Sequence, residues 1–267
     1  MTVLRTAAIA LSLFILTAAS ALAGPPLVTD DTGTVEVGKV EFELNGSFAT
    51  DKEIAAGVTT KSSRSETEIK ISTGLSRNTG ISVTIPYTVS GRVREDDKPV
   101  GRTVGPGDMA IELKYAFAEQ SGINFAIKPS VTVPTGKYSS GLSEGRWMFG
   151  GTLIATKEFA DGTCALHANM GYEHHSYRTD EIRDANRSDL WSGSIAGETE
   201  VNKGLFLAAD FGVAVPQDKN SRTPAAYALF GARYRIHTNL DINAAVKWGV
   251  TKPEDDISVQ YGLVLKI

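Results

Sequence analysis

Apolar and polar residues alternate with a period of two along most of the chain. In residues 109–117 the odd positions hold Met, Ile, Leu, Tyr and Phe, whereas Glu, Lys and Ala hold the even ones. Residues 81–89, 123–133, 240–250 and 257–267 show the same pattern. Successive side chains of a β-strand point to opposite faces, so each segment is predicted to be a strand with one apolar face.

The alternation predicts twelve strands, and no long helix. They lie near residues 35–50, 64–76, 80–92, 107–118, 122–134, 146–159, 163–177, 187–201, 204–215, 223–236, 239–251 and 256–267. The sixth, eighth and tenth segments alternate less cleanly, because Gly, Ala and Thr occupy their apolar face.

Short and long connections alternate between these segments. Five connections are tight turns rich in Gly, Asn and Asp, at residues 77–80, 119–122, 160–163, 202–204 and 237–239. The others are mostly longer and polar, such as 51–63, 93–106 and 177–186. All long loops would therefore lie at one end of the sheet, as in outer-membrane barrels, where the short turns are periplasmic. An even number of strands places both chain ends on the periplasmic side.

Three features favour an apolar face that points outward to lipid. The strands have about ten residues, which is enough to cross the hydrocarbon layer at a tilt. Twelve strands would enclose a lumen too wide for one layer of side chains to fill. Trp147, Trp191 and Trp248 each lie beside a long loop, and aromatic residues prefer the membrane boundary. We therefore expect an all-β, up-and-down antiparallel transmembrane barrel. A secreted or periplasmic β-sandwich is the alternative.

The first 23 residues have the features of a cleavable signal peptide. Arg5 is a positive n-region, residues 7–19 are apolar, and Ala21-Leu22-Ala23 fits the cleavage pattern. An uncleaved anchor is the alternative. The prediction is export to the bacterial outer membrane, with a periplasmic segment at 24–34 and the barrel at 35–267.

Composition removes several functional classes. The single Cys excludes an intramolecular disulfide and a zinc site built from cysteines. The formal charge of −4 and the absence of a basic run argue against a nucleic-acid partner. Beyond the N-terminus, no apolar stretch is long enough for a transmembrane helix. Nothing in the sequence implies a cofactor.

Three motifs could carry chemistry, and each is better explained structurally. Residues 134–137 end like a phosphate-binding loop, but the first Gly of that motif is absent. His174 and His175 are adjacent on a strand, so their side chains point to opposite faces and cannot easily share a metal. His167 has no evident nucleophile nearby. We therefore predict neither a catalytic nor a metal site.

The C-terminus and several internal motifs carry resemblances. Gln260, Gly262, Leu265 and Ile267 resemble the signal that barrel-assembly machinery recognises, although such signals usually end in Phe. The chain is similar to the outer-membrane transporter family described as putative MetA-pathway of phenol degradation proteins, and the motifs that carry this are residues 25–34, Gly38-Lys39, Gly107-Asp108, Lys114-Tyr115, Pro134–Gly136, Asn169 and Gly171-Tyr172. The resemblance implies a barrel that transports small, including aromatic, compounds.

The expected function is passage of small solutes, aromatic or hydrophobic ones included, through a lumen lined by polar and charged side chains. The candidate lining residues are Glu66, Glu68, Lys70, Asp108, Glu112, Lys114, Lys128, Glu198, Asp210, Arg233, Arg235, Asp241 and Lys247. Alternatives are a structural barrel closed by ion pairs and, less favoured, an outer-membrane enzyme. The partners would be outer-membrane lipid, the assembly machinery and the solute.

The segment before the first strand could enter the lumen. It is too polar for lipid and carries Asp30 and Asp31. Arg233 and Arg235 are expected near the periplasmic mouth, where they could pair with these two carboxylates. The segment would then act as a small plug. A solvated periplasmic tail is an equally favoured alternative.

Overall fold

The alternating segments form β-strands in the computed structural model, which describes residues 25–55 and 57–267. The predicted signal peptide lies outside the described residues. The strands are β1 (Val40–Ala55), β2 (Val58–Ser76), β3 (Thr79–Glu95), β4 (Lys98–Pro106), β5 (Met109–Gln120), β6 (Ile123–Val133), β7 (Met148–Phe159), β8 (Cys164–His174), β9 (Asp189–Asn202), β10 (Leu205–Ala214), β11 (Ala225–His237), β12 (Leu240–Gly249) and β13 (Ile257–Lys266). The helical elements are α1 (Asp180–Ala185) and the 3-10 turns η1 (Tyr138–Ser140) and η2 (Ala160–Gly162).

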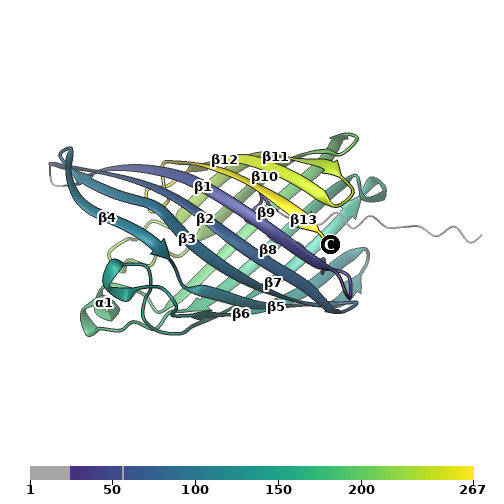
Figure 1. The fold of residues 1–267 in the computed structure, drawn as a ribbon, viewed down its shortest axis with the longest axis horizontal. Coiled ribbons are helices and arrows are strands. Elements are labelled where there is room, and N and C mark those ends of the chain that lie inside the picture. The colour runs from purple at the N-terminus through teal and green to yellow at the C-terminus, as the bar shows by residue number, and fades with distance from the viewer. Residues whose placement is uncertain (1–24, 56) are drawn as a thin grey trace, which may run out of the picture.

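The sheet closes on itself as an antiparallel barrel (Figure 1). β13 returns to pair with β1, with Phe42 opposite Leu265 and Phe48 opposite Val259. β4 and β5 lie in line along β3, because β5 pairs with its first residues and β4 with its last. They occupy one position in the ring, so the prediction of a twelve-stranded all-β barrel is confirmed.

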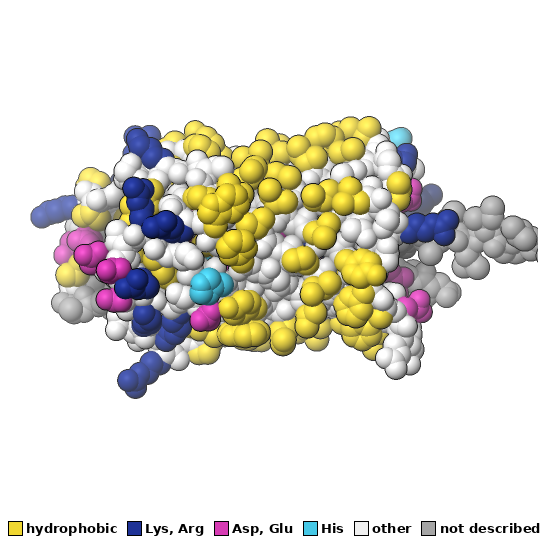
Figure 2. Space-filling model, turned by 90° about the horizontal axis from the view of Figure 1, so that it is seen from below, with side chains coloured by type: hydrophobic (Ala, Val, Ile, Leu, Met, Phe, Trp, Pro, Cys, Tyr) yellow, Lys and Arg dark blue, Asp and Glu magenta, His cyan; other side chains and the backbone are white. Residues whose placement is uncertain are grey.

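The apolar face of the strands points away from the lumen. Leu113 is 39% exposed and Ile127 is 40% exposed, whereas their neighbours Glu112 and Lys128 pair with each other on the inner face. Figure 2 shows the resulting belt of hydrophobic side chains, with charged side chains gathered toward the two ends. A surface of this kind is stable when lipid covers it.

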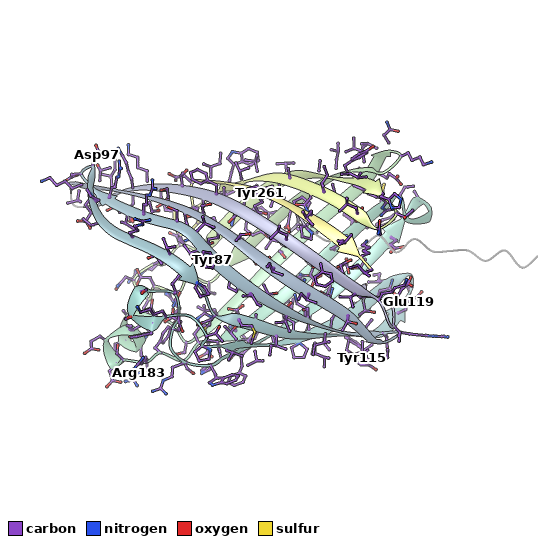
Figure 3. The ribbon with its side chains drawn as sticks, viewed as in Figure 1. Tyr87, Asp97, Tyr115, Glu119, Arg183 and Tyr261 are labelled. Atoms are coloured by element: carbon purple, nitrogen blue, oxygen red, sulfur yellow. The ribbon has the colours of Figure 1, made fainter. Side chains whose placement is uncertain are left out.

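The short connections lie at one end of the barrel and the longer ones at the other (Figure 1). In Figure 3, Asp97 and Arg183 mark the long-loop end and Glu119 marks the short-turn end. Two expected loops are corrected: residues 51–63 and 93–106 are largely strand, because β1 with β2 and β3 with β4 continue as hairpins. Their mostly polar sequences hide this extension, since the few apolar residues there, such as Ile54 and Val100, do not alternate regularly with polar ones.

A break separates β4 from β5, and two sequence motifs meet there. The Gly107 N–H donates to the Pro86 carbonyl at 2.9 Å, which continues the ladder with β3. The Asp108 carboxylate accepts from the Gly136 N–H at 2.9 Å. The Thr135 hydroxyl accepts from the Met109 N–H at 2.9 Å. Beyond the break, β4 is paired on its β3 side only, among the described residues.

The remaining connections have little regular structure. Among the described residues, no helix is both long and apolar enough to cross a membrane. The helix α1 has 6 residues and lies in the connection between β8 and β9.

The orientation of the barrel can be tested by cysteine labelling of whole cells. With Cys164→Ser as background, Asp96→Cys at the β3–β4 tip should react with a membrane-impermeant maleimide. Asn78→Cys in the β2–β3 turn should react only after the outer membrane is permeabilised, because short turns face the periplasm. Labelling of Asn78→Cys but not Asp96→Cys in intact cells would show the opposite orientation.

Candidate lumen site

Residues 25–35, here called the lumen segment, lie inside the barrel. The segment precedes β1, and Val37 forms a bridge to Gly74 where the chain turns into the lumen. Thr29 is 1% exposed and Asp31 is 3% exposed, although neither belongs to a strand. The wall therefore surrounds these residues.

Asp210 on β10 holds the middle of the segment. One oxygen of its carboxylate accepts the backbone N–H groups of Val28 and Thr29, each at 2.8 Å. The other accepts the Thr29 hydroxyl at 2.7 Å and the Tyr227 hydroxyl at 3.1 Å. Three of these four hydrogen bonds come from the lumen segment. Hydrogen bonds to an ionised acceptor each contribute roughly 1.5–3 kcal/mol, so Asp210 is a strong anchor.

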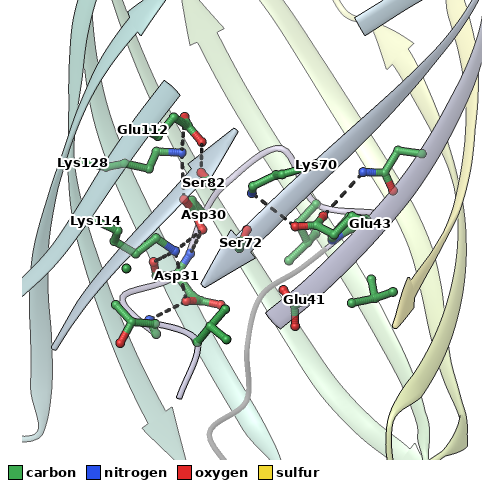
Figure 4. Close-up of a pocket in the computed structure, with 18 of the residues that line it drawn as sticks. Asp30, Asp31, Glu41, Glu43, Lys70, Ser72, Ser82, Glu112, Lys114 and Lys128 are labelled. Carbon is green, nitrogen blue, oxygen red and sulfur yellow. Dashed lines mark hydrogen bonds and ion pairs between the residues drawn. The ribbon is translucent and has the colours of Figure 1, made fainter. Parts of the chain in front are cut away.

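Asp30 and Asp31 face lysines of β5 and β6 (Figure 4). The Asp30 carboxylate lies 2.8 Å from the Lys114 ammonium and 2.9 Å from that of Lys128. Lys114 also lies 3.6 Å from the Asp31 carboxylate. Lys128 in turn contacts Glu112 at 3.1 Å. The lysines thus compensate the acidic pair where little water can reach it.

The expected pairing of Asp30 and Asp31 with Arg233 and Arg235 is wrong. Arg233 is engaged by neighbouring strands, with Glu198 at 3.2 Å and Asp241 at 3.3 Å. Its guanidinium also stacks over the Phe206 ring, 4.1 Å from the centroid. Arg235 contacts Asp241 at 3.4 Å. Carboxylates of the barrel wall thus pair with both arginines, and the lumen segment pairs with the lysines of β5 and β6 instead.

A third contact joins the segment to β7 and β8. The Thr32 N–H donates to the Thr156 hydroxyl at 3.1 Å, and that hydroxyl lies 3.1 Å from Nδ1 of His167. His167 is buried on the inner face. The Thr156 hydroxyl contacts both His167 and the lumen segment. We therefore assign His167 a structural role.

Most candidate lining residues lie on the inner face. Glu68, Lys70, Glu112, Lys114, Lys128, Arg233 and Asp241 border one cavity, and Glu66 borders a second. Glu198, Asp210, Arg235 and Lys247 take part in the inner contacts described above or, for Lys247, in a pair with Glu254. Asp108 lies apart, at the break between β4 and β5, where it fixes Gly136.

Two cavities lie between the lumen segment and the β1–β2 wall, with volumes of about 230 Å³ and 280 Å³. Both are bordered by Pro25, Leu27, Asn45 and Glu68, so these residues separate them. The Asn45 amide donates to the Glu68 carboxylate at 3.2 Å. Within the described residues, Glu68 has no ion-pair partner. The side chains that border both cavities therefore include Glu68, which lies where the two cavities meet.

Several residues of the site carry no distinctive sequence signal. Tyr227, Thr156 and Ser194 all contact the segment or its anchor. Gly231 leaves space for the segment, since a Cβ there would lie 2.6 Å from Pro26. The inward parity of these positions could have identified them as lining residues, but only the path of residues 25–35 shows that they are contacts.

Comparison with known proteins supports the sequence resemblance. A family model described as "Putative MetA-pathway of phenol degradation" matches residues 29–267. No curated protein matches the chain.

In the residues that the structure describes, no three His, Cys, Asp or Glu side chains are grouped so as to hold a metal ion.

Solved structures show the same barrel fold. The COG4313 outer membrane channel from Pseudomonas putida F1 has 16% identity over 89% of this chain and 98% of that chain, with a TM-score of 0.72. The NanC porin has 13% identity over 85% and 100% of the two chains, with a TM-score of 0.56. The translocator domain of the autotransporter NalP from Neisseria meningitidis has 12% identity over 86% and 89%, with a TM-score of 0.52.

Proposed function

We propose that this chain, which belongs to the "Putative MetA-pathway of phenol degradation" family, is an outer-membrane channel in which residues 25–35 narrow the passage. The observation that carries the proposal is the pair of cavities beside the lumen segment, which share Pro25, Leu27, Asn45 and Glu68 as lining residues. Solutes would diffuse along the β1–β2 wall, and displacement of the segment would widen the route.

The lining favours small polar solutes. An apolar cavity of about 150 Å³ accepts benzene, so cavities of about 230 Å³ and 280 Å³ have room for a ring-sized compound. However, Glu41, Glu43, Glu68 and Lys70 border the first cavity. Charged walls favour a solute that can hydrogen-bond, such as a phenolic compound, over a hydrocarbon.

Planar-bilayer recording tests this proposal. Purified chain should produce discrete conductance steps in KCl, with a preference for K⁺ over Cl⁻ because the Glu68 side chain borders both cavities. Glu68→Gln keeps the side-chain shape and removes the charge, so its reversal potential in a salt gradient should move toward zero. Glu119→Gln, at the exposed end of β5, is the matched control and should leave the potential unchanged.

A barrel that does not transport is the second candidate, and the internal ion pairs favour it. Lys114, Lys128 and Arg233 lie inside the barrel and are paired with carboxylates there. In that case correctly folded protein would give no conductance steps, and liposomes that contain it would not take up small sugars. Either result with folded protein would contradict the channel proposal.

A further inference from the structure

Five cations share one face of β1 to β4 near the long-loop end. Lys52 is opposite Lys61, and Lys61 is opposite Arg94 on the next strand. Two residues nearer the barrel centre, Arg92 is opposite Arg102. Residues directly opposite in an antiparallel sheet lie on the same face, and all five are exposed. These residues are called the outer cation band.

The band faces outward, just beyond the apolar belt. Lys61 has the same parity along β2 as the exposed Ile69 and Ile71. Lys52 has the same parity along β1 as Phe48, which is 48% exposed. Arg92 lies level with a position on β1 that is two residues beyond Phe48. Two residues correspond to about 7 Å along a strand. Figure 2 shows Lys and Arg side chains collected beyond the hydrophobic belt at this end of the molecule.

Few carboxylates pair with the cations of the outer cation band. Asp97 lies 2.7 Å from Lys61, and this contact lowers the pKa of the Asp97 carboxyl, so it stays ionised beside that lysine. Within the described residues, the other four cations of the band form no ion pair with a carboxylate. Like charges directly opposite on a sheet destabilise it, so this arrangement has an energetic cost unless an anion is present.

Acidic residues of the same hairpins lie on the other face. Glu53 is opposite Thr60, and Thr60 is opposite Glu95. This row has the opposite parity to Lys52, Lys61 and Arg94. The outward row of these hairpins is therefore basic, whereas the inward row contains both acidic and basic side chains, because Lys98 is opposite Glu95.

We propose that the outer cation band binds the phosphate groups of a phosphorylated glycolipid in the outer leaflet of the membrane. Arg presents a planar fork that matches phosphate oxygens, and three of the five residues are Arg. The band lies where lipid headgroups meet the protein, directly above the apolar surface that acyl chains cover. The proposal rests on the membrane location and is independent of transport.

Native mass spectrometry of the purified chain in detergent tests the proposal. The probe is a bis-phosphorylated, acylated disaccharide lipid, compared with the same lipid after enzymatic dephosphorylation. The intact lipid should bind in a salt-sensitive manner. The triple variant Arg92→Gln, Arg94→Gln, Arg102→Gln should bind at least about tenfold more weakly, since tenfold corresponds to ~1.4 kcal/mol, less than one charge-assisted hydrogen bond.

The matched control removes three exposed cations at the periplasmic end, with Lys39→Gln, Arg77→Gln and Lys203→Gln, and should keep full affinity. Equal binding of the two lipids by unaltered protein would overturn the proposal even if the triple variant failed to fold. Equal affinity of folded triple variant and control would overturn it as well. Conductance of the triple variant should be unchanged, so a failed channel proposal and a failed lipid site give different results.

Discussion

Deletion of residues 25–33 should raise single-channel conductance several-fold. Gly24 would then be joined to Thr34, which leaves the predicted cleavage site intact. The deletion removes the segment that contacts Asp210, Lys114 and Lys128 across the lumen. The two cavities would merge into one wider passage, and small-sugar uptake by liposomes should rise with the conductance.

A point variant should reproduce part of this effect. Asp210→Ala removes the acceptor of three hydrogen bonds from the segment. Loss of even ~1.4 kcal/mol of anchoring would increase the displaced population about tenfold. We expect brief transitions to the larger conductance of the deletion. Asp189→Asn, at the exposed start of β9, is the control. Conductance equal to wild type in both the deletion and Asp210→Ala would show that the segment does not limit passage.

Arginine on the lipid-facing side should prevent insertion. Leu113→Arg and Ile127→Arg each place a cation near the middle of β5 and β6, at an expected cost of about 2–4 kcal/mol near the bilayer midplane. Folding into lipid vesicles, followed by heat-dependent migration on gels and by urea titration, measures this loss. Glu112→Ala and Lys128→Ala face the lumen and should still insert. Equal loss in all four variants would contradict the assigned faces.

The strands were predictable because the membrane imposes a strict alternation. Leu113 and Ile127 must face lipid while Glu112 and Lys128 face water, and that pattern is visible in the sequence alone. The constraint ends above the membrane. Residues 93–106 form the end of β3, a tight turn and β4, and their three valines are too widely spaced to show a period of two.

The interior was less predictable, because sequence parity shows which side chains point inward but not which meet across the lumen. Asp30 was correctly associated with basic groups, yet its partners are Lys114 and Lys128. Arg233 does not pair with Asp30, because it already pairs with Glu198 on β9 and Asp241 on β12. This competition can be seen only in the closed barrel.

The partly paired β4 determines how deep the barrel can sit in its membrane. Backbone groups along an open sheet edge have no partner in hydrocarbon, and each unsatisfied group there costs several kcal/mol. On the side of the barrel where β4 has no second partner, we therefore expect the hydrocarbon layer to end near Pro106. On the β1 side the exposed Phe48 extends the apolar belt two residues further. Below Pro106, β5 has 12 residues, which at a tilt near 45° span about 28 Å, close to the ~25 Å apolar band of such barrels. The break at Gly107 thus marks the expected upper edge of the hydrocarbon layer on this side of the barrel.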